Sequence, residues 1–415
     1  MECALLRLPL EVFDIIGDQL QTPELIRLAA CSRGARELVL RESGAWRAKC
    51  ERVIPGVEPE PWHQADWARL WINVLEPYGD LLGLWSGKDG PYGSFLSVTA
   101  RAPKILASSV LANRVTDALN TVPVFEVGFQ AGGRVSKLCF RSMIPLDQGG
   151  HQEGDEDCGP HEADIVLNET GFRLTCCEDC GQDRFERRNR KVALMNRFVQ
   201  DSNDADEAQH QRIHSFYFHY LNESLTFDLW LAEVGKRGLP DSFADFRKLP
   251  RLSGGWESGT RLPLGIYKGS YASHGVEFVL LHREGDRLVA TKITGDPHIW
   301  AGSVTFRLEL SSEVREEENF VVPEGVAWRE GTSDQWEDLT TVSKMAGEGQ
   351  IAQFGYKDPQ FVPVSVYVFD RGGEGQPQRF GVHWLSLEGL SIFERLESED
   401  IEKATHLMNS IKLEL

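Results

Sequence analysis

Six cysteine and histidine residues gather in the central part of the chain and could bind a metal ion. They are Cys139, Cys158, His161, Cys176, Cys177 and Cys180. The pairs Cys158–His161 and Cys177–Cys180 have the spacing of metal-binding knuckles, and zinc prefers a tetrahedron of sulfur and nitrogen ligands. Such a staple would stabilise a Gly- and Asp-rich stretch that has no core of its own. The spacing therefore predicts a zinc-binding insertion over residues 139–182, with a group of buried or unligated cysteines as the alternative.

Polar residues at the end of a predicted strand could form a small binding pocket. The strand carries Lys292 and Thr294 on one face and ends in Gly295-Asp296-Pro297. A cation, a hydroxyl and a carboxylate would then surround a polar pocket at the mouth of a barrel. An Asp-Pro turn beside a surface lysine accounts for the same spacing equally well, so the residue pattern leaves both interpretations open.

A catalytic site would need a nucleophile that is activated by a neighbouring base. Ser273, His274 and Asp296 could be combined into a hydrolase triad, but the chain has no Gly-x-Ser-x-Gly elbow to present the serine. A histidine at such a turn more often satisfies local hydrogen bonds. We therefore expect a protein that is not an enzyme, and a hydrolase is the weakest of the hypotheses.

The composition narrows the classes of function. With 44 basic and 63 acidic residues, the chain of 415 residues has a formal net charge of −19. No basic excess is therefore left for general nucleic-acid binding. The N-terminus lacks the basic and apolar segments of a signal peptide, and no apolar run reaches the roughly 18 to 20 residues that span a bilayer. We expect a protein of the cytoplasm and nucleus with reduced cysteines, and neither nucleic acid nor membrane among its partners.

Residues 6–52 are expected to form a small helical bundle. Apolar residues recur at Val12, Ile15, Ile16 and Leu20, which is one stripe of a short helix. A bundle of only about 45 residues is marginally stable by itself, so part of its apolar surface should dock on another structure. Residues 53–80 continue as a helical linker that contains three tryptophans.

From residue 81 onward the periodicity changes to that of β-strands. Short runs such as Val304–Leu310 and Val364–Phe369 alternate apolar and polar residues and are separated by Gly, Asp and Asn. These runs predict an antiparallel sheet or barrel. A faint repeat, in which Leu82-Gly-Leu-Trp-Ser-Gly87 matches Leu264-Gly-Ile-Tyr-Lys-Gly269, suits two similar hairpins at the start of a closed sheet.

The N-terminal pattern resembles the F-box along its whole length. The F-box is a helical module that buries exposed apolar residues on the Skp adaptor, and Skp in turn joins it to a cullin. The residues that the resemblance assigns to the Skp contact are Leu8, Pro9, Val12, Ile16, Leu20, Leu25, Leu28 and Trp46. The predicted bundle shows more apolar faces than it can bury internally, which suits such docking. An ordinary helical cap on the barrel is the alternative.

The remainder of the chain resembles the F-box only protein 31 family. The matching blocks include Gly90-Pro-Tyr-Gly93, Tyr267–Gly275, Ala290–Pro297 and Phe380–Leu387. The resemblance implies a β-barrel substrate domain and ubiquitin-dependent turnover of proteins, such as D-type cyclins, that are captured through a short C-terminal degron. The pocket would then comprise Tyr271, Ser273, His274, Lys292, Thr294 and Asp296.

The same resemblance implies a structural zinc ion. By position, its ligands fall on Cys139, His161, Cys176 and Cys180. Cys180 departs from the family, in which the corresponding ligand is a histidine several residues later. Cys158 and Cys177 are therefore substitutes for the fourth ligand.

These observations predict an α+β protein with three parts: an N-terminal helical F-box over residues 1–52, a helical linker over 53–80 and an antiparallel β-barrel with the zinc-stapled insertion over 81–415. The predicted function is substrate recognition in a Skp–cullin–F-box E3 ubiquitin ligase. The partners would be Skp, through it the cullin–RING machinery, and protein substrates that are sent for proteasomal degradation. A β-barrel sensor of a small molecule or of stress, coupled to the ligase by the F-box, is the alternative.

Overall fold

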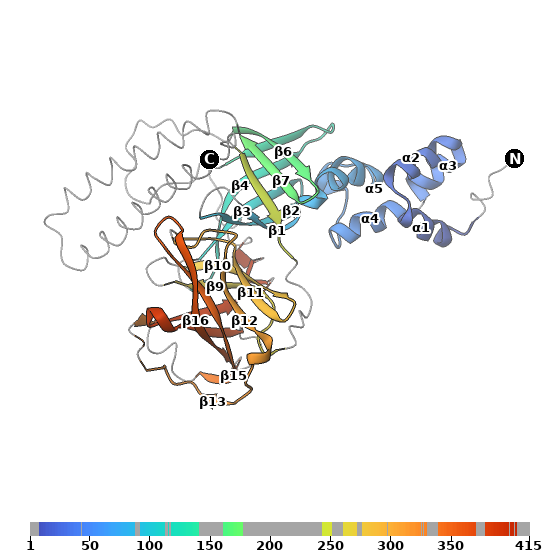
Figure 1. The fold of residues 1–415 in the computed structure, drawn as a ribbon. Coiled ribbons are helices and arrows are strands. Elements are labelled where there is room, and N and C mark those ends of the chain that lie inside the picture. Colours follow the sequence, from blue (N-terminus) through green and yellow to red (C-terminus); the bar gives the residue numbers. More distant parts are fainter. Residues whose placement is uncertain are drawn as a thin grey trace, which may run out of the picture.

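The computed structural model of the chain forms an N-terminal group of helices followed by two antiparallel β-sheets (Figure 1). It describes residues 8–42, 44–87, 92–112, 115, 118–140, 161–176, 243–250, 260–271, 276–296, 298–324, 326, 328–329, 339–370, 378–397, 399–401 and 403–404. Within these ranges, every helix is too short or too polar to cross a membrane. The helices extend to one side of the first sheet, and the second sheet lies below the first in the view of Figure 1.

The N-terminal unit consists of short helices that pack around one small core. They are α1 (Leu10–Gln19), α2 (Thr22–Cys31), α3 (Arg33–Glu37), η2 (Leu38–Glu42) and α4 (Ala45–Val53). Capping determines where two of them begin: Gln21 and Glu24 form a capping box at α2, and the Ser32 hydroxyl accepts the Ala35 N–H at 3.0 Å. Phe13, Leu25, Ala29, Val39, Trp46 and Ala68 form the core.

A linker of very short helices joins this unit to the first sheet. Its elements are η3 (Glu60–Trp62), α5 (Trp67–Leu70), η4 (Trp71–Leu75), α6 (Glu76–Tyr78) and η5 (Gly79–Leu81). The Trp71 indole N–H donates to the Thr22 hydroxyl at 2.8 Å on the helical side. On the other side, the rings of Trp62 and Tyr78 lie 5.7 and 5.6 Å from that of Phe129. The linker is therefore packed at both ends.

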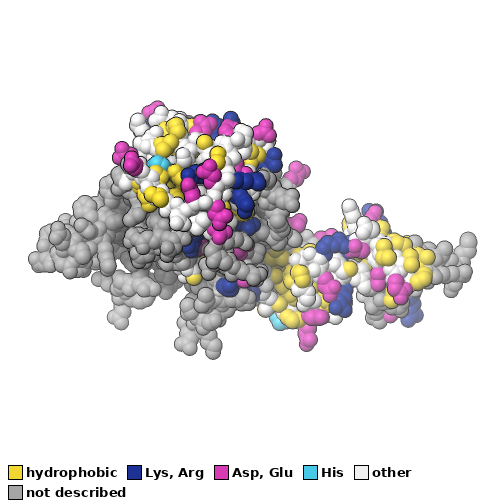
Figure 2. Space-filling view, turned by 90° about the horizontal axis from the view of Figure 1, so that it is seen from below, with side chains coloured by type: hydrophobic (Ala, Val, Ile, Leu, Met, Phe, Trp, Pro, Cys, Tyr) yellow, Lys and Arg dark blue, Asp and Glu magenta, His cyan; other side chains and the backbone are white. Residues whose placement is uncertain are grey.

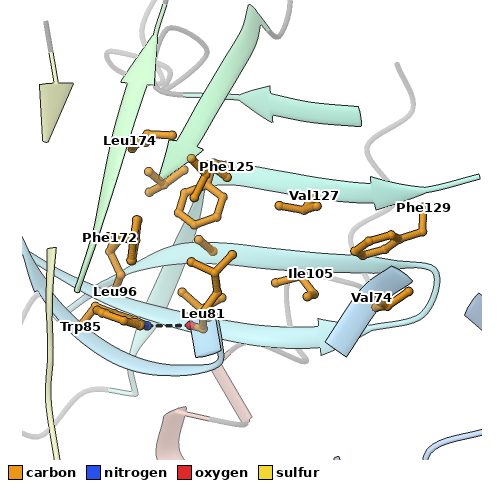
Figure 3. Packing of buried hydrophobic residues seen from close by; sticks show 14 of the residues in the cluster. Val74, Leu81, Trp85, Leu96, Ile105, Phe125, Val127, Phe129, Phe172 and Leu174 are labelled. Atoms are coloured by element: carbon orange, nitrogen blue, oxygen red, sulfur yellow. Dashed lines mark hydrogen bonds between the residues drawn. The ribbon is translucent and has the colours of Figure 1, made fainter. Parts of the chain in front are cut away.

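The first sheet closes into a barrel, which we call barrel 1. Its strands are β1 (Gly83–Gly87), β2 (Ser94–Arg101), β3 (Lys104–Leu111), β4 (Asn120–Phe129), β5 (Val135–Cys139), β6 (His161–Asn168), β7 (Gly171–Cys176) and β8 (Phe243–Lys248). They follow one another in sequence order, and β1 pairs with β8 to close the ring. Trp85 and Phe125 pack against Phe172 in the interior, with ring centres 4.7 and 5.5 Å from it, and Val74 of η4 lies near Phe129 at one end (Figure 3).

The second sheet forms another ring, which we call barrel 2. Its strands are β9 (Gly265–Ser270), β10 (Val276–Glu284), β11 (Arg287–Lys292), β12 (Val304–Glu309), β13 (Glu318–Asn319), β14 (Trp328–Arg329), β15 (Thr340–Gln353), β16 (Lys357–Phe369), β17 (Arg379–Trp384) and β18 (Gly389–Arg395). The order is β12-β11-β10-β9-β18-β17-β16-β15, and pairing of β12 with β15 closes it. The 3-10 turns η8 (Leu310–Ser312) and η10 (Leu385–Leu387) complete it.

The repeat seen in the sequence marks the first strand of each barrel. Trp85 of β1 and Tyr267 of β9 are both buried in the interior of their barrel. Each satisfies its polar atom in the same way: the Trp85 indole N–H donates to the Leu81 carbonyl, and the Tyr267 hydroxyl donates to the Pro263 carbonyl, both at 2.7 Å. Buried Trp and Tyr need such a partner, so the local geometry recurs along with the sequence.

The two barrels share a hydrophobic contact. Phe95 of β2 and Phe278 of β10 pack with ring centres 4.9 Å apart, and Ile266 and Ile293 belong to the same cluster.

The prediction of N-terminal helices followed by antiparallel barrel strands is confirmed. The prediction of a single barrel over residues 81–415 is corrected, because the described strands close into two separate rings.

Candidate functional site

One end of barrel 2 contains a cavity of about 390 Å³. Residues from several strand ends form its wall: Tyr271 follows β9, Lys292 ends β11, Thr305 lies on β12, and Trp384 ends β17. β15 and η10 complete it with Gln350, Ile351, Ala352 and Leu387. The cavity therefore combines an aromatic and aliphatic wall with a few polar groups, as ligand sites in proteins usually do.

A buried ionic cluster lies at the base of this cavity. The Lys292 ammonium group contacts both the Glu277 and the Asp296 carboxylate, and its side chain is 0% exposed. It also lies 4.1 Å from the centre of the Tyr271 ring, which is a cation–π distance. A buried charge needs such partners because its desolvation is costly.

The environment shifts the protonation equilibria of the cluster. Burial alone would lower the pKa of Lys292, but the carboxylates of Asp296 and Glu277 outweigh it and raise this pKa. Burial raises the pKa of Glu277 well above its ordinary value, because the attraction of Lys292 compensates only in part. Lys292 therefore stays charged, and Glu277 tends to hold a proton.

The turn after β11 presents the Asp296 carboxylate. Its Oδ1 atom accepts the backbone N–H groups of His298 and Ile299 at 2.6 and 2.7 Å, while Oδ2 contacts Lys292. The Asp296 N–H in turn donates to the Ile299 carbonyl at 3.0 Å. The carboxylate is therefore held by local backbone geometry and a charge at the same time.

Hydrogen bonds also orient the aromatic wall. The Tyr271 hydroxyl lies 2.9 Å from the Thr305 hydroxyl, and the Trp384 indole N–H donates to the Ser391 hydroxyl at 3.2 Å. A ring nitrogen of His298 also lies 2.9 Å from the Ala352 carbonyl. The β11–β12 turn and β15 are thereby tied together across the rim of the cavity.

The predicted pocket residues are not all brought to the cavity. Tyr271, Lys292 and Asp296 line it. Thr294 is not among the residues that form its wall, and its hydroxyl accepts the Phe278 N–H at 2.8 Å. Ser273 and His274 lie outside the described residues. The hydrolase hypothesis would use the Asp296 carboxylate as part of a triad, but Lys292 and two backbone N–H groups already bind this carboxylate.

Glu277, which the residue pattern did not single out, completes the ionic cluster. Its signal was a single acidic residue inside the apolar run Val276-Glu-Phe-Val-Leu280 of β10. A carboxyl group in such a run has to find a buried partner. The partner, Lys292, is on the neighbouring strand β11, where Val279 is paired with it in the register.

The N-terminal helices carry exposed apolar residues, visible in yellow at the helical end in Figure 2. Leu8, Val12 and Ile15 are 37%, 41% and 68% exposed, and Leu10 and Ile26 are also exposed. Pro9 is exposed, whereas Ile16, Leu20 and Leu28 are half-buried. Val12 and Ile15 are three residues apart and lie on one side of α1, and Leu8 precedes the helix.

Two residues that were predicted to contact Skp belong to the core instead. Leu25 is 0% and Trp46 is 1% exposed, and the Trp46 indole N–H donates to the Val39 carbonyl at 2.8 Å. A partner could reach these two side chains only if the helical unit opened. Ile15, which was not predicted as a contact, is the most exposed of the apolar residues on α1.

Three of the predicted metal-binding positions come together at one end of barrel 1. Cys139 on β5 is paired with His161 on β6, and Cys176 on β7 is paired with Ala163, two residues along β6. Because side chains alternate along a strand, this register puts the three positions on one face of the sheet. Cys139 and Ala163 are buried in the barrel interior.

This placement fits a metal site, although the ligand set extends beyond what the structure describes. Cys158, Cys177 and Cys180 lie outside the described residues, and His161 and Cys176 are described only as parts of their strands. Among the side chains that are described, no three His, Cys, Asp or Glu residues form a metal-binding group.

Comparison with known proteins finds similarity along most of the chain. Residues 250–400 match the family described as "Cyclin D1 binding domain", and this range contains all strands of barrel 2. The chain is 24% identical to F-box only protein 31 of Rattus norvegicus over 478 residues, which covers 95% of this chain and 85% of that protein. It is 25% identical to the Homo sapiens protein of the same name over 323 residues, which covers 75% of this chain and 54% of that protein.

A shorter similarity reaches a plant protein. The chain is 28% identical over 128 residues to the chloroplastic protein EXECUTER 2 of Arabidopsis thaliana, which covers 27% of this chain and 18% of that protein. This similarity is confined to about a quarter of the chain, whereas the F-box only proteins extend over most of it.

Proposed function

From the similarity of this chain to F-box only protein 31, we propose that it is the substrate-recognition subunit of a Skp–cullin–F-box ubiquitin ligase. In this proposal the N-terminal helices bind a Skp adaptor and barrel 2 captures a protein substrate, in the cytoplasm and nucleus. The chain itself performs no bond chemistry, because transfer of ubiquitin belongs to the cullin–RING machinery and its conjugating enzyme.

The observation that carries the ligase proposal is the apolar surface of α1. A unit whose core already contains Phe13, Leu25 and Trp46 still leaves Val12 and Ile15 exposed at 41% and 68%. Exposed apolar residues on one side of a helix are typical of a surface that docks on a partner. The packed linker would then hold Skp at a constant position relative to barrel 1.

A co-purification experiment tests this assignment. A Val12→Asp/Ile15→Asp variant should lose a co-expressed Skp protein that the wild type retains. The substitution puts two negative charges where apolar side chains would be buried against Skp. Val321→Asp is the matched control, since Val321 is 78% exposed and lies in barrel 2. Full retention of Skp by the α1 variant would refute the docking proposal.

For the substrate we propose that the cavity of barrel 2 takes the C-terminal residues of a peptide degron. Its volume of about 390 Å³ suits one or two side chains, and Lys292 and Asp296 supply polar groups next to the Trp384 wall. The family match to a cyclin D1 binding domain lies over this same barrel, which supports proteins of the D-type cyclin class as substrates.

Exchange of one carboxylate tests the cavity. Asp296→Asn keeps an oxygen for the His298 and Ile299 N–H groups but removes a negative charge from Lys292. A panel of peptides with free and blocked C-termini should therefore be ranked differently by this variant. Asp245→Asn is the control, because Asp245 pairs with Arg173 on the surface of barrel 1. An unchanged ranking for Asp296→Asn would locate the degron site elsewhere.

The mainly apolar lining of the cavity also supports a second candidate function, a small-molecule sensor coupled to the ligase. Tyr271, Trp384 and Ile351 form an apolar wall around few polar groups, which resembles drug-sized ligand sites. A native mass spectrum of the purified protein distinguishes the two candidate functions, because a retained small ligand would raise the measured mass. A binding peptide would displace that ligand only if both occupy the cavity.

We also propose that a structural zinc ion closes the end of barrel 1. Cys139, His161 and Cys176 would supply three ligands from adjacent strands, and Cys180, Cys158 or Cys177 the fourth. Zinc would supply a cross-link between β5, β6 and β7, where the chain between β5 and β6 is long.

A further inference from the structure

The connection between β1 and β2 of barrel 1 touches the loop that carries Asp296 in barrel 2. The Gly295 N–H donates to the Tyr92 carbonyl at 2.9 Å. Gly93, the next residue, has a φ angle of +59°, and a Cβ atom on it would lie 2.5 Å from Ala301 Cβ and 2.9 Å from the Ile293 carbonyl oxygen. Residues 92–93 therefore fit against the β11–β12 loop, residues 293–303, without space for any side chain at Gly93.

Contacts within barrel 2 hold other parts of the β11–β12 loop, among them the one between His298 and the Ala352 carbonyl at 2.9 Å. The start of the loop is bound by Phe278, whose carbonyl accepts the Ile293 N–H at 2.7 Å. Its end is bound through the Gly302 N–H, which donates to the Lys292 carbonyl at 2.7 Å. Gly295 lies between these anchors, immediately before Asp296, and its N–H is bound by the other barrel. A displacement at Gly295 would thus be passed directly to the Asp296 carboxylate.

The same region is held from the side by the inter-barrel core. Phe95, two residues beyond Gly93, packs on Phe278 with ring centres 4.9 Å apart, and Ile293 is buried beside them. Both the strand that ends the turn in barrel 1 and the strand that anchors the loop in barrel 2 take part in this contact. Tightly packed interfaces transmit small shifts instead of absorbing them.

We infer that the Tyr92–Gly93 turn of barrel 1 is a positioning element for the cavity of barrel 2, and that it sets peptide preference through Asp296. The inference rests on the proposed degron site. It assigns a role to barrel 1 beyond that of a spacer. Barrel 1 would hold one wall of the substrate cavity through the contacts of Tyr92 and Gly93 with the β11–β12 loop. Gly93 touches no ligand in this scheme and acts only through the β11–β12 loop.

Two alanine substitutions isolate this contact. Gly93→Ala adds a methyl group that has to displace the β11–β12 loop, whereas Gly285→Ala adds one in open space in the β10–β11 turn. Gly285 has the same φ of +59°, so both variants place an L residue at the same positive φ, and only Gly93→Ala adds the close contact. Ala301→Val is a second variant that presses on the contact from the other side, should Gly93→Ala fail to fold.

Hydrogen exchange and peptide binding are then measured on the full chain with Skp. Gly93→Ala should speed amide exchange over residues 293–301 and change the ratio of affinities for two panel peptides about fivefold or more, whereas Gly285→Ala should match wild type. Adding Ala301→Gly to Gly93→Ala should restore part of the wild-type ratio, because it removes the nearest atom. Unchanged exchange, or faster exchange with an unchanged affinity ratio, would overturn the inference. A wild type that binds no peptide would instead overturn the degron proposal itself and this inference with it.

Discussion

The ammonium group of Lys292 lies 4.1 Å from the centre of the Tyr271 ring. With Glu277 and Asp296 in contact with the same group, each side of this cation has a protein partner, and water does not reach it. The Tyr271 hydroxyl is bound to Thr305 at 2.9 Å, so the ring that covers the cation is itself held in place. The base of the cavity is therefore a preorganised cluster, and its net charge depends on which of its ionisable groups hold a proton.

Removal of the cation should destabilise barrel 2. Lys292→Met leaves the buried Asp296 carboxylate without its counter-charge, and breaking a buried pair in this way typically lowers the free energy of unfolding by about 3–5 kcal/mol. Urea unfolding of the two proteins measures the difference. Lys104→Met is the control: Lys104 is 51% exposed and pairs with Glu126 at 3.0 Å, so a loss of about 1 kcal/mol or less is expected. Equal losses for the two variants would contradict the role of the cluster.

The raised pKa of Glu277 predicts a specific pH dependence of stability. Above the ordinary value of 4.5, the unfolded chain releases the Glu277 proton while the folded chain still holds it. The free energy of unfolding should therefore fall as pH rises through the window above 4.5. Glu277→Gln has no proton to release at this position, so its stability should gain on that of wild type as pH rises above 4.5.

Unfolding curves at several pH values measure this gain. Glu399→Gln serves as the control, because Glu399 is 80% exposed and the substitution changes no buried group. If the stability of Glu277→Gln fell in parallel with that of wild type across the window, Glu277 would not titrate as its burial implies.

The fold could be predicted in kind but not in number of barrels. The alternation of residues such as those of Val364–Phe369 identified antiparallel strands, and the repeat around Trp85 and Tyr267 was visible. A local repeat cannot state whether two similar strands belong to one sheet, because strand pairing depends on contacts between distant residues. In the structure, each copy starts its own ring.

The site could be predicted from local pattern only in part. Lys292 and Asp296 are four residues apart and were found, whereas Glu277 is brought to them by the pairing of β10 with β11. On the helices, periodicity identified an apolar stripe but not which residues were buried. Leu25 and Trp46 face the core formed by residues from other helices, which no single-helix pattern reveals.

Burial of Trp46 leads to a prediction that separates folding from docking. Trp46→Ala should lower the free energy of unfolding of the helical unit by about 3–5 kcal/mol, because a large buried ring is replaced by a cavity. Ile15→Ala, at a side chain that is 68% exposed, should change stability by no more than about 0.5 kcal/mol and yet weaken Skp binding. Thermal unfolding and Skp titration of both variants check this. A stable Trp46→Ala protein that fails to bind Skp would restore Trp46 as a direct contact.

The last prediction concerns zinc and uses two buried cysteines with opposite expectations. Metal analysis of the purified protein should find about one zinc per chain, and Cys139→Ser should lower this content, because Cys139 is paired with His161 at the shared end of β5 and β6. Cys50 is equally buried, but burial raises the pKa of its thiol to about 12, and its sulfur contacts the Trp67 carbonyl at 3.6 Å. Zinc binds the thiolate and not the thiol, so Cys50→Ser should leave the zinc content unchanged. Wild-type protein without zinc would reject the site. Loss of zinc in both variants would instead indicate that the metal is released when the fold is damaged, and not that Cys139 binds it.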